Sequence, residues 1–345
     1  MQALILVGGE GTRLRPLTSP ALPKPVVPLV DRPFLVYMLE WLRRHGVDDV
    51  IMSCGFGAGS VRDALGDGSA YGVTLRFAEE PEPRGTAGAL KYAEEFLQDR
   101  FLMLNGDVLT DMDLTAQIAQ HEATGAKATL ALVPVDDPTR YGLVRTTADN
   151  AVTGFLEKPS PDQIDTNLIS AGAYVLERSI LDLIPPDRNV SIEREVWPQL
   201  VGDGVFAFAH EHAYWLDIGT PETYLKGTTD ILEGFVKTEA VQRIGAGCEI
   251  APDAHVASTA VLGAGVKVGS EARIERAVVL AGCEIGAHCQ ISDCILAPGV
   301  RVGDRTQIAD GAVLGANVEV GADNVLSRGI RVFGGTKLAD AAIKF

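Results

Sequence analysis

Cysteine is scarce in this chain of 345 residues, and its five cysteines are scattered. Cys54, Cys248, Cys283, Cys289 and Cys294 form no C-x-x-C pair. This argues against a zinc site, a dithiol redox centre or a disulfide framework. An odd, scattered set instead indicates reduced thiols, and we therefore expect a cytoplasmic protein.

Long apolar runs and an excess of positive charge are also absent. No apolar run reaches the 18 residues of a transmembrane helix, and residues 1–7 lack the basic flank and cleavage site of a signal peptide. Against 46 Asp and Glu stand 30 Lys and Arg, for a net charge of −16. We therefore expect neither nucleic acid nor a membrane as partner. An acidic protein that binds polyanions must concentrate its few cations in the site.

The first part of the chain alternates short apolar runs with amphipathic segments. With 46% hydrophobic residues, the chain can bury a large core and form one large or two ordinary domains. The alternation predicts a doubly wound, mostly parallel, Rossmann-like α/β sheet, which binds its ligand at the carboxyl ends of the strands. Helices are expected over residues 33–45, 85–96, 114–124 and 221–238, with a Ser191 N-cap opening another. Strands after residue 141 should extend the sheet.

A six-residue repeat follows. Apolar residues recur at this spacing from Ile244 to Ile274 and from Leu296 to Leu338, with two five-residue steps between these runs. A period of six fits no α-helix and is typical of the hexapeptide parallel β-helix. We therefore predict an α/β domain over residues 1–238 and a β-helix domain over residues 239–345.

The first 28 residues carry a phosphate-binding pattern. A buried strand over residues 1–7 is followed by Gly8-Gly9-Glu10-Gly11-Thr12-Arg13-Leu14-Arg15, and Lys24 lies between two prolines. Glycines after a first strand let backbone N–H groups approach an anion closely. The spacing fits neither G-x-G-x-x-G, whose third glycine is replaced by Leu14, nor the P-loop.

The opening string resembles the signature of the sugar-1-phosphate nucleotidylyltransferases. Further matching segments are Gly85-Thr-Ala-Gly88, Asn105-Gly-Asp107, Tyr141-Gly142, Glu157-Lys158-Pro159, Ala171-Gly172, Ser191-Ile-Glu-Arg-Glu195 and Trp215-x-Asp217-Ile-Gly-Thr-Pro221. Their order is most similar to mannose-1-phosphate guanylyltransferases, followed by glucose-1-phosphate thymidylyl- and uridylyltransferases. The resemblance implies a left-handed β-helix, a homo-oligomer formed through it, and substrates that are a nucleoside triphosphate and a sugar-1-phosphate.

The resemblance also implies roles for individual residues. Arg13, Lys24 and Lys158 are the expected catalytic residues, with Arg13 clamping the departing pyrophosphate and Arg15 either assisting or forming a salt bridge. Mg²⁺, a hard cation that prefers carboxylate oxygens, is expected on Asp107 and Asp217. The expected nucleotide-binding residues are Leu6, Gly8, Gly9, Gly11, Thr12, Glu80, Gly85 and Asn105. The expected sugar-phosphate residues are Gly142, Glu157, Lys158, Gly172 and Glu193.

The base is expected to be read by Glu80. Guanine offers two donors on one edge, and a carboxylate accepts both, whereas a Gln suits uracil or thymine better. This favours GTP and hence GDP-mannose as the product.

Three alternatives stay open. One is the same chemistry with dTTP or UTP and glucose-1-phosphate, since Ser170-Ala-Gly stands where mannose-specific relatives often have Asn-Ala-Gly. Another is a silent regulatory subunit that binds nucleotide sugar, although Arg13, Lys24, Asp107 and Asp217 are all present. The third is a hexapeptide acyltransferase, for which His255 or His288 would be the candidate histidine.

Overall fold

The computed structural model describes residues 1–19, 22–55 and 57–345. Contacts divide the chain into two compact units. The first comprises Met1–Gly9 and Leu35–Trp215, and the second comprises Glu10–Phe34 and Leu216–Phe345. Within the described residues, no helix is both long and apolar enough to span a membrane. We predicted a domain boundary at residues 238/239, before the β-helix repeats, and this boundary stays a prediction.

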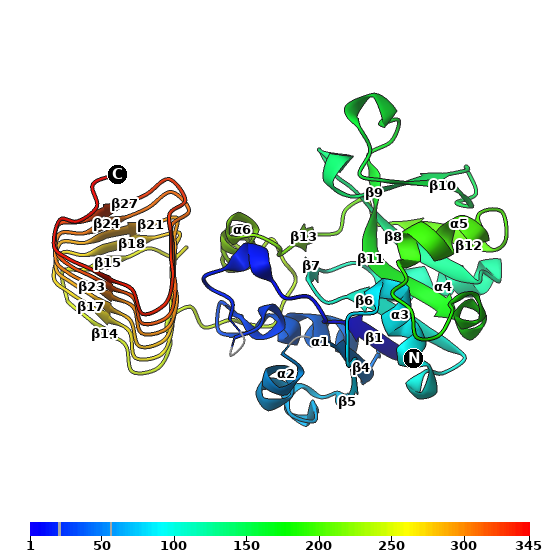
Figure 1. Cartoon of the computed structure of the whole chain (residues 1–345), viewed down its shortest axis with the longest axis horizontal. Coiled ribbons are helices and arrows are strands. Elements are labelled where there is room, and N and C mark those ends of the chain that lie inside the picture. The colour runs from blue at the N-terminus through cyan, green and yellow to red at the C-terminus, as the bar shows by residue number, and fades with distance from the viewer. Residues whose placement is uncertain (20–21, 56) are drawn as a thin grey trace. The chain divides into compact units, whose positions relative to one another are not determined.

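A mixed sheet of nine strands forms the centre of the first unit (Figure 1). Its strand order is β10-β9-β11-β6-β1-β4-β5, with β8 beside β11 and β12 beside β8. The pairs β6/β1, β1/β4 and β4/β5 are parallel, as the alternation of strands and helices predicts. The later strands do extend the sheet, but β11 pairs antiparallel with β6, β8 and β9. The strands are β1 (Gln2–Leu6), β4 (Asp49–Cys54), β5 (Thr74–Glu79), β6 (Arg100–Asn105), β8 (Ala128–Pro134), β9 (Gly142–Thr146), β10 (Val152–Glu157), β11 (Leu168–Glu177) and β12 (Val205–Ala209).

Helices cover this sheet and bury its apolar residues. They are α1 (Phe34–Arg44), α2 (Ala58–Leu65), α3 (Gly85–Tyr92), α4 (Leu114–Thr124) and α5 (Trp197–Leu200). The expected helices at 33–45 and 114–124 are confirmed, whereas α3 ends at Tyr92 and a 3₁₀ turn, Glu94–Phe96, follows it. The Ser191 hydroxyl does accept from the Arg194 N–H, but the helix that it caps, Ile192–Val196, is a π-helix. A large buried core lies around Leu4, Phe101 and Trp197.

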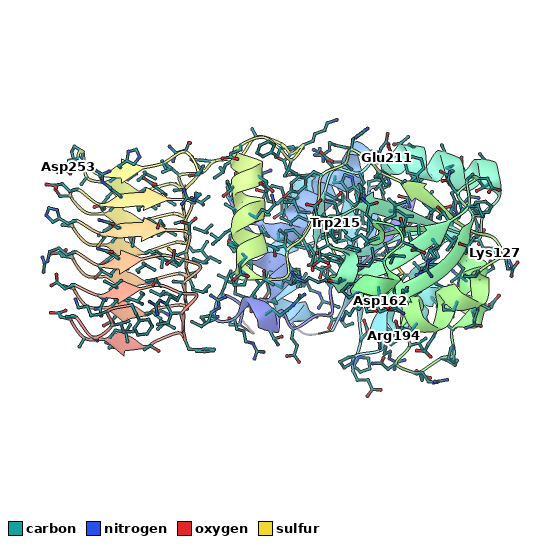
Figure 2. The ribbon with its side chains drawn as sticks, turned by 90° about the horizontal axis from the view of Figure 1, so that it is seen from above. Lys127, Asp162, Arg194, Glu211, Trp215 and Asp253 are labelled. Atoms are coloured by element: carbon teal, nitrogen blue, oxygen red, sulfur yellow. The ribbon has the colours of Figure 1, made fainter. Side chains whose placement is uncertain are left out.

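The second unit contains the β-helix, whose three sheets confirm the hexapeptide repeat. Stacked coils place every third strand in the same sheet, as the columns of strands in Figures 1 and 2 show. Ile274, Ile291 and Ile308 stack in successive coils and are fully buried. The first sheet is β14 (Glu249–Ile250), β17 (Lys267–Val268), β20 (Glu284–Ile285), β23 (Arg301–Val302), β26 (Glu319–Val320) and β29 (Lys337–Leu338). The second is β15 (His255–Val256), β18 (Arg273–Glu275), β21 (Gln290–Ser292), β24 (Gln307–Ile308) and β27 (Val325–Leu326). The third is β16 (Val261–Leu262), β19 (Val278–Val279), β22 (Ile295–Leu296), β25 (Val313–Leu314) and β28 (Arg331–Val332).

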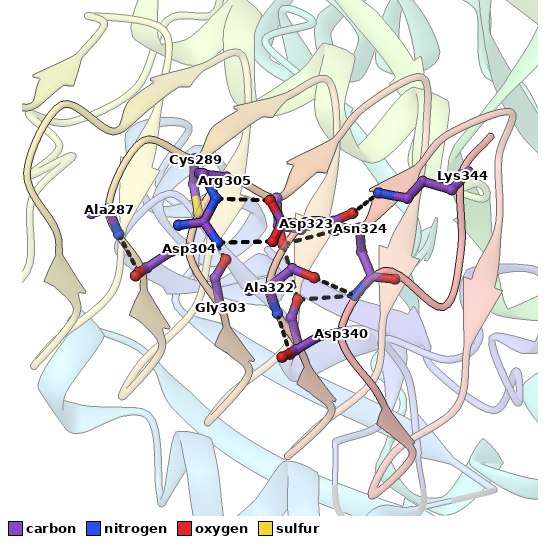
Figure 3. Close-up of polar contacts among 12 residues, drawn as sticks. Ala287, Cys289, Gly303, Asp304, Arg305, Ala322, Asp323, Asn324, Asp340 and Lys344 are labelled. Atoms are coloured by element: carbon purple, nitrogen blue, oxygen red, sulfur yellow. Dashed lines mark hydrogen bonds and ion pairs between the residues drawn. The ribbon is translucent and has the colours of Figure 1, made fainter.

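Polar side chains join the corners of successive coils (Figure 3). Arg305 donates to both oxygens of Asp323 at 2.8 Å, although it lies one coil away. Asp304 and Asp340 accept from the backbone N–H groups of Ala287 and Ala322, both at 2.8 Å. The two aspartate contacts satisfy backbone N–H groups at the tight corners, and the arginine pair links one coil to the next.

Residues 10–34 and the helix α6 (Pro221–Leu232) complete the second unit. The segment 10–34 contains two short strands, β2 (Pro28–Leu29) and β3 (Arg32–Pro33), and the Tyr224 hydroxyl of α6 donates to the Pro28 carbonyl. The helix expected to reach residue 238 ends at Leu232, because Gly234 adopts the left-handed φ of +81° that stops helices. Arg331 of the β-helix lies 3.5 Å from Glu222 near the start of α6.

Candidate functional site

Several expected site residues follow the carboxyl ends of neighbouring parallel strands in the first unit. Leu6, at the end of β1, pairs in register with Ser53 of β4 and Asn105 of β6. Gly8 lies two residues after the end of β1, and Asp107 lies two residues after the end of the adjacent strand β6. Glu80 directly follows β5, which is separated from β1 by β4. This edge of the sheet is where the sequence predicted the ligand.

Gly8 and Gly9 leave the protein surface open at this edge. A Cβ added to Gly9 would meet no atom within 4 Å, and at Gly8 it would make only an ordinary contact with Gly55. Neither residue has a left-handed φ. Neither backbone conformation nor internal packing therefore requires glycine here, and close approach by a ligand would account for it.

The Glu80 carboxylate is held in one orientation by two donors. The Ser53 hydroxyl donates to Oε1 at 2.9 Å, and the Arg84 backbone N–H donates to Oε2 at 3.2 Å. Burial raises the pKa of Glu80, while these two hydrogen bonds act in the opposite direction. Each carboxylate oxygen has a second lone pair, so the group can accept further bonds from a base edge.

A cleft of about 220 Å³ brings together most of the expected sugar residues. Gly142, Glu157 and Glu193 all line it, and so does Ser170. They come from β9, β10, β11 and the π-helix, so four separate segments form one polar-edged cavity. The remaining lining residues are Leu143, Val144, Phe155, Leu156, Arg194, Trp197 and Pro198.

Hydroxyl groups fix Glu193 in this cleft. Its Oε2 atom accepts from Thr86 at 3.0 Å and from Ser191 at 2.7 Å. In the same cleft Gly142 lies against Glu157, and a Cβ on Gly142 would come within 3.1 Å of Glu157 Oε2. Two carboxylates in one small cleft suit the recognition of hydroxyl groups, which are donors.

Gly172 and Asn105, expected in different parts of the site, pack on each other. Gly172 has a φ of +74°, and a Cβ there would lie 2.7 Å from Asn105 Nδ2. Glycine is thus required both by conformation and by the side chain beside it. Gly85 also has a left-handed φ of +69°, but there the carbonyl of Val190 fills the space, at 2.6 Å from an added Cβ.

Lys158 has an unfavourable backbone conformation. Its φ is +51°, which lysine rarely adopts, and proline follows it. Its N–H donates to the Tyr141 carbonyl at 3.0 Å, and its side chain is exposed. Strain of this kind clusters at ligand sites, where surrounding structure enforces it.

The second unit contains a cluster of Arg13, Lys24 and Asp217. Arg13 Nη2 and Lys24 Nζ each lie 4.0 Å from a different Asp217 oxygen. The Lys24 side chain is only 10% exposed, whereas that of Arg13 is 58% exposed. Burying an ammonium group is costly without a counter-ion, and Asp217 provides one. The cluster keeps one net positive charge, which suits an incoming polyphosphate.

Gly219 is a site residue that the sequence did not single out. A Cβ at Gly219 would lie 2.6 Å from Arg13 Nη2 and 3.0 Å from Asp217 Oδ1, so a larger residue would displace the Arg13 guanidinium from its present position beside Asp217. Gly11 likewise leaves room for Lys24, because a Cβ on Gly11 would lie 2.9 Å from Lys24 Cβ. Its φ of +61° also favours glycine. The string Asp217-Ile-Gly-Thr-Pro221 contained the signal, but the contact with residue 13 is visible only in the fold.

The remaining expected residues have plainer settings. Arg15 forms a surface ion pair with Glu10, at 3.5 Å. This agrees with the second of the two roles expected for Arg15, a salt bridge. Leu6 packs against the core of the first unit, and the exposed Thr12 begins a 3₁₀ turn that ends at the buried Leu14. Asp107 is half-buried in the turn between β6 and β7 (Val108–Thr110). Among the residues described, no group of three or more His, Cys, Asp or Glu forms a metal cage.

Comparisons with known proteins agree with this organisation. Residues 2–234 match the family described as Nucleotidyl transferase, and residues 223–326 match the EIF2B subunit epsilon LbH domain. The mannose-1-phosphate guanylyltransferase of Mycobacterium tuberculosis is 37% identical over 289 residues, covering 81% of this chain and 79% of that protein. The mannose-1-phosphate guanyltransferase of Debaryomyces hansenii is 39% identical over 245 residues, covering 69% and 67%.

One solved structure with a bound nucleotide analogue is also similar. HddC from Yersinia pseudotuberculosis, complexed with GMP-PN, has a TM-score of 0.58 and 31% identity. The similarity covers 67% of this chain and 99% of that one. Since the first family match spans well over half of the sequence and agrees with the fold and the clustered site residues, the chain belongs to the nucleotidyl transferase family.

Proposed function

We propose that the protein joins GTP and mannose-1-phosphate to give GDP-mannose and pyrophosphate. The names of the similar guanylyltransferases support the choice of both substrates. The observation that carries the choice of GTP is the Glu80 carboxylate, fixed by Ser53 and by the Arg84 N–H. A carboxylate with both oxygens held in place matches the two adjacent donors of guanine.

The reaction is an in-line displacement at the α-phosphorus. The sugar-1-phosphate oxygen is already anionic near neutral pH, so no general base is required. The site must bring two anions together and offset the charge that develops on the leaving pyrophosphate. Arg13 and Lys24 supply that charge, and Asp217 holds both cations at one place before the nucleotide binds.

The cleft of Gly142, Glu157 and Glu193 is the proposed sugar site. Its two carboxylates would accept hydrogen bonds from the sugar hydroxyls, and Gly142 would let the sugar approach the backbone. Lys158 adjoins Glu157 in sequence and would bind the sugar phosphate.

Members of this family generally use a divalent metal ion, and we propose Mg²⁺. Asp107 and Asp217 are each proposed as a ligand. Their carboxylate oxygens are the donors that Mg²⁺ prefers. The absence of a closed cage among the described residues fits an ion that completes its shell with water and substrate phosphates. Bound there, the metal would neutralise triphosphate charge.

The protein is further proposed to be a cytoplasmic homo-oligomer that associates through its β-helix. All five cysteines are free, and four are fully buried, which suits a reducing compartment. The β-helix offers three sheets of stacked strands as surfaces for association.

A substrate matrix tests the proposal. Pyrophosphate release is measured with Mg²⁺ for GTP, dTTP, UTP and ATP against mannose-, glucose- and glucosamine-1-phosphate. GTP with mannose-1-phosphate should give the highest kcat/KM. A preference for dTTP or UTP with glucose-1-phosphate would contradict the proposed activity and indicate a thymidylyl- or uridylyltransferase instead. No release with any pair, while nucleotide sugar still binds, would indicate the silent subunit.

A further inference from the structure

One sheet of the β-helix carries charges of alternating sign on its outer side. We call this column the charge ladder, and it consists of Glu249, Lys267, Glu284, Arg301, Glu319 and Lys337. Each is the first residue of its strand, and the parallel register places each beside the next. Five are exposed and Glu319 is half-buried, while most of the apolar residues that follow them point into the core.

The ladder lies along an open groove of about 850 Å³. The residue that follows each of four successive strands is a glycine, namely Gly269, Gly286, Gly303 and Gly321, so no side chain stands between the ladder and the corner. Stacking explains these glycines, because a Cβ on Gly303 would lie 2.6 Å from the Ala322 nitrogen in the next coil. The result is a face from which, apart from the exposed Ile250 of the first strand, mainly the charged side chains project.

The other two sheets of the β-helix differ. On the third sheet the outer residues Val261, Val278, Ile295 and Val313 are already buried. Gly315, beside that sheet, lies against Pro16 of the segment 10–34. The second sheet presents His255, Arg273, Gln290, Gln307 and Val325, which show no alternation of charge. The charge ladder is therefore the distinctive exposed face of the β-helix.

The alternating charges of the ladder form ion pairs within the chain. Arg301 lies 3.8 Å from Glu284, and Lys337 lies 3.0 Å from Glu319. Such exposed pairs contribute little to stability, because water screens them and two long side chains must be held in place. Yet an even-numbered alternating column has a second property, because it is complementary to its own reverse.

We infer that the charge ladder binds the charge ladder of a second copy, with the two β-helix axes antiparallel. A two-fold axis in the contact plane, parallel to the strands and between β20 and β23, places Glu284 opposite the partner's Arg301. The same operation pairs Lys267 with the partner's Glu319 and Glu249 with the partner's Lys337. A parallel arrangement, or a slip by one strand, would place like charges opposite each other throughout. The interface is isologous and its register is set by charge.

The inference rests on the proposed self-association and not on the substrates, so failure of the substrate matrix would leave it standing. It is tested by sedimentation velocity on the full chain and on Glu284→Arg and Arg301→Glu, each alone and mixed. Each single variant opposes like charges at the centre, so the dimer Kd should rise about tenfold or more. In the mixture the heterodimer has opposite charges at both central contacts, and dimer should return. Within each chain the 284/301 pair stays broken, so recovery reports a contact between chains.

Matched controls are Gln290→Arg and Gln307→Glu on the neighbouring sheet, in the same two coils. These should leave the dimer unchanged, and thermal melting should show that all four variants are folded. The wild-type dimer should also weaken as salt rises. A monomeric wild type, a dimer unaffected by either ladder variant, or a mixture that stays monomeric would each overturn the inference.

Discussion

Gly219 lies so close to Arg13 that a Cβ on Gly219 would come within 2.6 Å of the guanidinium Nη2 atom. Gly219→Ala should therefore push Arg13 away from Asp217. Misplacement of a charged group by about 1 Å can cost roughly 10²-fold in rate. We expect kcat to fall by about that factor, with little change in stability, in a pyrophosphate-release assay.

Gly59→Ala is the control for this substitution. Gly59 has no left-handed φ, and an added Cβ would meet nothing within 4 Å. Its activity should match that of the wild type. Full activity of Gly219→Ala would show that the position of Arg13 does not limit the reaction.

Glu80→Gln should lower the preference for GTP over UTP. The Ser53 hydroxyl can turn to accept from the new amide NH₂, so the side chain keeps its place and presents a donor beside an acceptor. A hydrogen bond to a charged group contributes about 1.5–3 kcal/mol. We expect the ratio of kcat/KM values to fall about tenfold or more. Glu79→Gln, one residue earlier and paired with Arg62, is the control and should keep the ratio.

The GTP preference should also depend on pH. Burial holds the pKa of Glu80 above its ordinary 4.5, so Glu80 takes up a proton at a higher pH than an exposed glutamate does. The carboxylate is the form that accepts both guanine donors. The GTP to UTP ratio should thus be high above that pKa and fall as the pH drops through it. The two triphosphates titrate alike, so the pH dependence of the ratio of their kcat/KM values reports on Glu80. A wild-type ratio that does not change with pH, like the ratio expected for Glu80→Gln, would contradict the role of Glu80.

Lys158→Asn should separate binding from stability. Asparagine tolerates a left-handed backbone better than lysine does, so stability should stay equal or rise by up to about 1 kcal/mol. The KM for sugar-1-phosphate should rise about tenfold or more, because the cation is lost, while the KM for GTP changes little. Arg328→Asn, at another exposed left-handed position with a φ of +54°, is the control and should leave both KM values unchanged. An unchanged KM in Lys158→Asn would exclude a contact with the sugar phosphate.

Local pattern was enough to predict both kinds of architecture. Alternating apolar runs predicted the parallel strands β1, β4, β5 and β6, and the six-residue period predicted the stacked coils, because both patterns repeat in the sequence. Two helix ends were misjudged: α6 ends at Leu232, before a left-handed Gly234, and α3 ends at Tyr92 rather than near residue 96. The helical turn expected after Ser191 is present, as a π-helix. The order of the strands in the sheet could not be predicted, because no local sequence pattern indicates that β11 pairs with β6.

The candidate site was predictable as a set of motifs but not as a set of contacts. Gly142, Glu157 and Glu193 were expected together and line one cleft. The residues that hold the site residues in place were missed. Ser53, Thr86 and Gly219 have common side chains or none, and each acts on a residue at least 27 positions away. Such pairings follow from the fold, not from local composition.

The division of the chain has a consequence for any shortened product of its gene. Arg13 and Lys24 are encoded near the start, yet residues 10–34 group with residues 216–345. A product that stops before residue 216 would keep both cations and the whole nine-stranded sheet but lack the carboxylate between them. Such a fragment would contain the complete opening motif but not Asp217, the carboxylate that lies 4.0 Å from both Arg13 and Lys24.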